Sequence, residues 1–91
     1  MREEILYDKI KVPTDDKMLY ISYYILKKEY NEETNEEEWG IRIEKNDGES
    51  FESETISYMT PDFDRLNLIM DILVRNSVTP FSLKEILYEI I

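Results

Sequence analysis

Carboxylates are the most abundant groups in this chain that could do chemistry. The 91 residues include 21 Asp and Glu but no His and no Cys. Six of these carboxylates gather in one stretch: Glu29, Glu32, Glu33, Glu36, Glu37 and Glu38. Hard cations such as Ca²⁺ prefer several carboxylate oxygens, but the stretch lacks the regular ligand spacing and the central Gly of a calcium-binding loop. We therefore expect a solvated, mobile acidic loop at residues 31–38 and assign no metal-ligating residue.

The usual groups for acid–base and nucleophilic catalysis are missing. The sequence has no His with a pKa near neutrality, no Cys nucleophile and no glycine-rich phosphate loop. Paired carboxylates share a proton in some active sites, but chance pairs are expected in a chain this rich in acids. We predict no catalytic residue, no cofactor and no enzymatic activity.

The formal net charge of -10 disfavours nucleic acids and anionic membranes as partners, because such a surface repels phosphate groups. Tyrosines 20, 23 and 24 with Trp39 could stack on bases, but acids surround them. The C-terminal part could form a helix-turn-helix, yet its second helix offers DNA only Lys84. No apolar run is long enough for a membrane span, and none follows the first residues as in a signal peptide. We expect a cytoplasmic protein.

The first two-thirds of the chain reads as strands. Residues 18–30 are rich in β-branched and aromatic types, with apolar side chains on both faces, which indicates a central strand. Residues 39–45 alternate apolar and polar, and Asn46, Asp47 and Gly48 predict a hairpin turn. Residues 51–58 should return antiparallel, with either a bulge or a late-starting pairing. Residues 4–12 fit a short strand, so we predict a meander of three to four strands.

The last third reads as two helices. Thr60 is the expected N-cap of the first, with Pro61 as its first residue and an end near Arg75. Ser82 is the expected cap of the second, paired with Glu85 in a capping box, and that helix should run to Ile91. The first helix should cover Trp39, Ile41 and Ile43 with this stripe: Phe63, Leu66, Ile69, Met70 and Leu73. The sequence thus predicts a single α+β domain over residues 1–91.

Three short motifs carry a family resemblance over roughly residues 18 to 91. They are Tyr23-Tyr24, Trp39-Gly40-Ile41, and Asn76-Ser77-Val78-Thr79-Pro80 followed by Leu83. With them the chain resembles a family of short, uncharacterised clostridial proteins of the Firmicutes, known only as a domain of unknown function. The resemblance implies an architecture and a cytoplasmic setting, and it transfers no site residues. The turn at residues 78–80 is the first place where we would look for a partner surface.

One apolar row on the central strand predicts a contact surface. Met18, Tyr20, Tyr24 and Leu26 share the face that the first helix cannot cover if it packs on the opposite face. Residues 5–12, the second helix with Ile86 and Ile90, a second copy of the chain or another protein could each bury the row. We expect a non-enzymatic protein-interaction or regulatory module; the alternative is a small-molecule or cation sensor using the acidic loop or a helix–sheet cleft.

Overall fold

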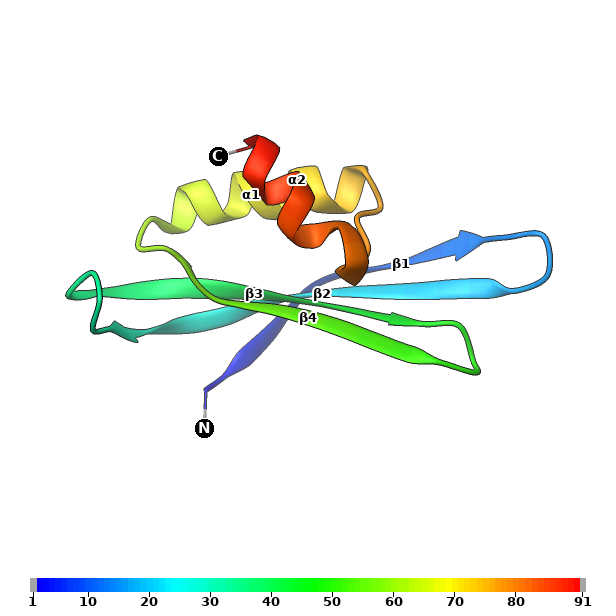
Figure 1. Ribbon diagram of the computed structural model, residues 1–91, viewed down its shortest axis with the longest axis horizontal. Helices are drawn as coiled ribbons and strands as arrows, with labels where there is room; N and C mark the ends of the chain where they lie inside the picture. Colours follow the sequence, from blue (N-terminus) through cyan, green and yellow to red (C-terminus); the bar gives the residue numbers. More distant parts are fainter. Residues whose placement is uncertain (1, 91) are drawn as a thin grey trace.

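A four-stranded sheet with two helices on one face makes up the computed structural model, which describes residues 2–90 (Figure 1). The strands are antiparallel neighbours in the order β1-β2-β3-β4. Along the described chain the elements are β1 (Glu4–Pro13), β2 (Met18–Asn31), β3 (Glu36–Asn46), β4 (Phe51–Thr60), α1 (Phe63–Arg75), the 3₁₀ turn η1 (Pro80–Ser82) and α2 (Leu83–Ile90). The predicted α+β meander followed by two helices is confirmed, including the strand expected at residues 4–12. The expectation that the second helix reaches Ile91 lies outside the described residues.

The core lies between the helices and the inner face of the sheet. Alternate residues of β2 and β3 face α1, whose inward stripe is fully buried, as predicted for Leu66, Ile69, Met70 and Leu73. Phe63 is half exposed and instead packs its ring on Trp39, with the ring centroids 4.8 Å apart.

Tyr23 anchors the link between the helices to the centre of the sheet. Its hydroxyl donates a hydrogen bond of 2.8 Å to the Val78 carbonyl. Burial raises the pKa of the Tyr23 hydroxyl, and the nearby Asp8 carboxylate adds to the rise.

Bulges bend the end of the sheet that carries the acidic turn. The β2–β3 register shifts between Leu26 and Glu29, and the β3–β4 register shifts between Trp39 and Ile41. Of the two alternatives considered for the last strand, the bulge is thus confirmed. Gly40 sits where β4 comes closest, because a Cβ on it would lie 2.5 Å from the Ser57 carbonyl oxygen. Only Gly fits this position without moving the backbone.

The acidic stretch is more ordered than predicted. β2 continues to Asn31 and β3 begins at Glu36, so the expected loop over residues 31–38 shrinks to a four-residue turn. Glu38 is buried, and its Oε2 accepts hydrogen bonds from Asn31 Nδ2 at 2.9 Å and Thr34 Oγ1 at 2.6 Å. Pairing of the flanking backbone outweighs repulsion between the carboxylates, because their side chains spread into solvent.

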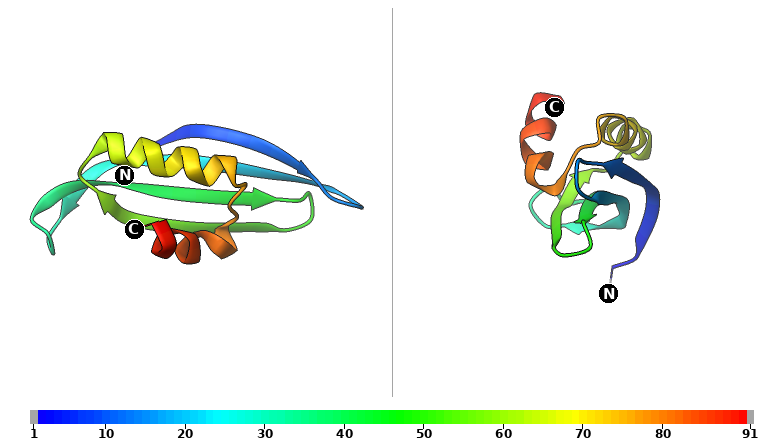
Figure 2. Two further views of the ribbon diagram at one scale, coloured as in Figure 1. Left: turned by 90° about the horizontal axis from the view of Figure 1, so that it is seen from above. Right: turned by 90° about the vertical axis from the view of Figure 1, so that its right-hand side faces the viewer.

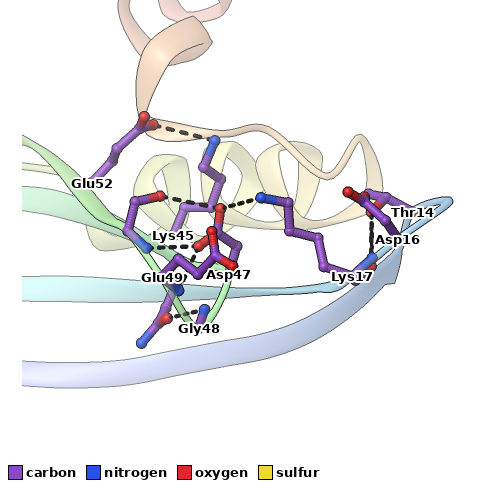
Figure 3. Close-up of polar contacts among 10 residues, drawn as sticks. Thr14, Asp16, Lys17, Lys45, Asp47, Gly48, Glu49 and Glu52 are labelled. Carbon is purple, nitrogen blue, oxygen red and sulfur yellow. Dashed lines mark hydrogen bonds and ion pairs between the residues drawn. The ribbon is translucent and has the colours of Figure 1, made fainter.

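The β3–β4 hairpin turn is held by Asp47 and is tied to the turn between β1 and β2 (Figure 3). The Asp47 carboxylate accepts from the backbone N–H groups of Ser50 and Glu49 and pairs with Lys17 Nζ at 3.2 Å. These contacts, the Ser50 backbone first, hold the pKa of Asp47 below its ordinary value. Gly48 adopts a φ of 91°, as expected for this turn.

Both helix starts differ from the prediction. Asp62 is the N-cap of α1, because its side chain accepts hydrogen bonds from the backbone N–H groups of Asp64 and Arg65. The predicted cap, Thr60, instead accepts a hydrogen bond from the backbone N–H of Asp62, before the helix begins. The Asp62 carboxylate also complements the positive end of the helix dipole. At the second start, Thr79 and Ser82 form the capping box across η1, so the helical path opens at Pro80 and Glu85 is not needed.

Candidate functional site

The predicted row on β2 lies on the face of the sheet away from the helices. Met18 and Tyr20 are each 38% exposed, and Tyr24 is half-buried. Leu26 is only 5% exposed, although it is not part of the core cluster on the helix side. The row therefore offers less apolar surface than its sequence implied, and its role in an interface stays a prediction.

Cationic side chains of the neighbouring strands cover the row. The Arg42 guanidinium stacks on Tyr24, 5.2 Å from its ring centroid, and Lys9 and Lys11 each lie 6.0 Å from the Tyr20 ring centroid. Arg42 is held by Glu44 and by Glu4, whose Oε1 lies 2.6 Å from Arg42 Nε as an ion pair without hydrogen-bond geometry. Long side chains can cover apolar surface with their stems in this way.

Arg2 covers the bulged end of the same face. Its guanidinium donates hydrogen bonds to carbonyls on three strands: Lys27 on β2 at 2.6 Å, Glu38 on β3 at 2.8 Å and Ser57 on β4 at 2.6 Å. It also lies 5.5 Å from the Tyr58 ring centroid. Sequence reasoning missed this residue, because no local pattern shows which carbonyls the bulges leave without partners.

Neither of the two segments of this chain that were considered as a cover for the row folds over it. β1 pairs edge to edge with β2, from Glu4 opposite Leu26 to Pro13 opposite Met18. α2 packs on the same face as α1 (Figure 1). Both alternatives within one chain are therefore wrong, because β1 extends the sheet sideways and Leu87 of α2 joins the core on the helix side.

An open apolar groove lies between α2 and the edge strand β4. It has a volume of about 710 Å³ and is lined by Ile56, Tyr58, Met59, Lys84, Leu87 and Tyr88. Figure 2 shows α2 running along the β4 side of the sheet, at the opposite edge from β1. In position, this groove corresponds to the helix–sheet cleft that the sequence analysis named as an alternative site.

One of the two most exposed aromatic side chains of the described residues, Tyr88, lines this groove, and the other, Phe81, lies earlier in the same segment. Phe81, in η1, is 92% exposed, and Tyr88, on α2, is 88% exposed. Both come shortly after the turn at residues 78–80, where Val78 and Pro80 are buried and hold the chain in place. The sequence signal that could have located this surface is the spacing of Lys84, Leu87 and Tyr88, which puts them on neighbouring positions of one helix face.

Acidic side chains outnumber basic ones around the groove. β4 contributes Glu52 and Glu54, and α2 contributes Glu85 and Glu89 against the single Lys84. Lys84 Nζ lies 3.5 Å from Glu54 Oε1, and its side chain is 72% exposed. Such exposed pairs contribute little to stability. Breaking the ion pair between Lys84 and Glu54 therefore costs little free energy.

The carboxylates of the acidic turn do not converge on a common point. No group of three or more Asp or Glu residues that could hold a metal ion occurs within residues 2–90. Likewise, none of the helices formed by these residues is long and apolar enough to cross a membrane.

Comparison with known proteins gives a family but no activity. The search of curated proteins found no match, and neither did the search of solved structures. One family model, described as a family of unknown function (DUF6514), matches residues 1–91. The chain belongs to this family of unknown function.

Proposed function

We propose that this protein is a non-enzymatic interaction module that holds a segment of another protein in the groove between β4 and α2. The observation that carries the proposal is the open apolar groove, which is lined by the exposed Tyr88. Soluble proteins rarely leave large apolar side chains grouped on the surface, and such groups tend to mark interaction sites. Aromatic residues are also the side chains that contribute most to protein interfaces.

The proposal also includes the cellular location of the protein, its origin and the kind of partner that it binds. A cytoplasmic location and a clostridial origin are supported by the resemblance carried by residues 76–80 and the two strand motifs. The net charge of -10 supports a protein partner in preference to a nucleic acid or a membrane. The absence of His and Cys from the sequence supports a role without catalysis.

Site-specific photocrosslinking in the native cells tests the groove. A photoreactive phenylalanine analogue replaces Tyr88 in one strain and Leu68, which is 67% exposed on α1, in the control strain. We expect one defined protein to crosslink from position 88 and not from position 68, and to bind the purified chain directly. Equal crosslinking from both positions, or none from position 88, would count against the groove.

A small apolar molecule in the same groove is the competing function. It would give no protein crosslink from position 88. Native mass spectrometry of the protein purified from its own cells would then show a bound small molecule, which Tyr88→Lys would remove.

A further inference from the structure

The groove borders a free strand edge. β4 is the last strand in the described order β1-β2-β3-β4, so its outer row of backbone N–H and C=O groups has no strand beside it. Natural proteins protect such edges with bulges, charges or a covering element. The β4 bulge lies beyond Ile56, so residues 51–56 keep a regular register with β3.

α2 turns this edge into a slot. The helix runs along the β4 side of the sheet (Figure 2), and Lys84, Leu87 and Tyr88 face Ile56 and Met59 across the groove. An extended segment placed next to β4 would pair with its free backbone groups and would send every second side chain toward the groove. The slot thus offers backbone pairing and apolar burial together.

We infer that the partner segment binds as an additional strand on β4, with an apolar side chain opposite Ile56 and basic side chains opposite Glu54 and Glu52. This inference rests on the proposed function. Glu54 pairs with Ile43 and Ile56 pairs with Ile41, so both lie on the helix side of the sheet, with Glu52 two residues before Glu54. Side chains directly opposite on neighbouring strands are close enough to contact each other, and opposite charges stabilise the pair.

The charge around the slot selects a basic partner. The two elements that flank it carry four carboxylates and one ammonium group, and Lys45 of β3 pairs with Glu52 at 3.3 Å, so the net charge around the slot is -2. A second copy of this chain would bring Glu52 and Glu54 of its own β4, and a further net charge of -10, to the same place. A segment in which Lys or Arg alternates with other residues before an apolar residue avoids this repulsion.

Synthetic peptides test the inference without knowledge of the partner. The probes are two blocked peptides in which two Lys and two Val alternate with Thr, one with the Lys first and one with the Val first, so that both strand directions are tested; their controls carry Glu in place of Lys or N-methyl groups on the backbone. Fluorescence anisotropy measures the dissociation constants. We expect one of the two Lys peptides to bind at least roughly ten-fold more tightly than either of its controls, the equivalent of about one charged or backbone hydrogen bond.

Two protein variants test whether the preference for the Lys peptide arises at the slot between β4 and α2. Glu54→Lys should reverse the preference between the Lys and Glu peptides. Glu49→Lys makes the same charge change in the exposed β3–β4 turn and should leave the preference as it is. When the Lys peptide is added to isotope-labelled protein, the amide chemical shifts should change mainly in β4 and α2.

Four results would overturn the inference. Equal binding of the Lys and Glu peptides, or no binding of either, would contradict the proposed charge pattern. Unchanged binding of the N-methylated peptide would contradict binding as an additional strand. A stable dimer in light scattering that Tyr88→Lys converts to monomer would identify a second copy as the occupant. The proposed function is judged separately, because crosslinking from position 88 does not depend on how the segment is paired.

Discussion

Arg2 should stabilise the sheet far more than an N-terminal arginine ordinarily would. Its guanidinium connects three strands at the bulged end, through hydrogen bonds of 2.6, 2.6 and 2.8 Å to backbone carbonyls. The side chain is only 16% exposed. The Arg2→Met variant keeps the apolar stem and removes all three donors, so it isolates the guanidinium.

The expected loss follows from the geometry. A hydrogen bond from a charged donor contributes roughly 1.5 to 3 kcal/mol when well buried. At Arg2 only the bond to the Glu38 carbonyl is partly buried, and the other two lie near solvent, where water can replace the donor. We therefore expect Arg2→Met to lower the free energy of unfolding by about 2 to 3 kcal/mol, and Tm by roughly 10 to 20 °C for a domain of this size.

Urea and thermal melts followed by circular dichroism measure this effect. The matched control is Arg75→Met, which removes an exposed guanidinium paired with Asp71 on the same helix. That variant should cost less than about 0.5 kcal/mol. Equal and small losses for the two variants would refute the role given to Arg2.

Three further changes test the core, the buried tyrosine and the acidic turn. Leu66→Ala should lower the free energy of unfolding in a urea melt by about 2 to 5 kcal/mol, whereas Leu68→Ala on the outer face of α1 should change it little, because only Leu66 is buried. Tyr23→Phe should reduce the loss of stability at high pH. The folded pKa of Tyr23 lies above its ordinary value of 10.0, so its stabilisation is complete below pH 10.0 and falls by up to about 1.4 kcal/mol per pH unit above it. Melts at rising pH should show a steeper fall in the wild type than in Tyr23→Phe, and equal slopes would contradict the burial of the hydroxyl. Glu38→Ala should cost about 1 to 3 kcal/mol by leaving buried donors without an acceptor, whereas Glu37→Ala should be near neutral, and the reverse order would mean that the turn is not anchored at Glu38.

Local patterns in the sequence predicted the elements and the main core. The alternation in β2 and β3 placed Tyr23, Ile41 and Ile43 inside, and the helical spacing of Leu66 and Leu73 matched them, because burial of apolar side chains follows the period of each element. Errors in the secondary-structure prediction were confined to element ends. Asp62 replaced Thr60 as a cap because β4 continues to Thr60 before the chain can turn into α1.

The parts of the surface that depend on distant residues could not be predicted. The sequence showed Tyr24 as an apolar residue on an open face, but not that Arg42 would cover it from the next strand. It showed an apolar second helix, but not that Tyr88 would remain exposed beside β4. Both outcomes are set by strand register and helix placement, which no short pattern encodes.

The most direct test of the proposed function is the affinity of the crosslinked partner for three forms of the protein: wild type, Tyr88→Lys and Leu68→Lys. Both substitutions put a charge on an exposed apolar position of a helix, and thermal melts should confirm that all three forms remain folded. We predict that Tyr88→Lys weakens binding at least about ten-fold in calorimetry, as expected for an aromatic anchor of an interface, and that Leu68→Lys leaves the dissociation constant unchanged. An unchanged affinity for Tyr88→Lys, or an equal loss for both variants, would contradict the proposal that the β4–α2 groove is the binding site.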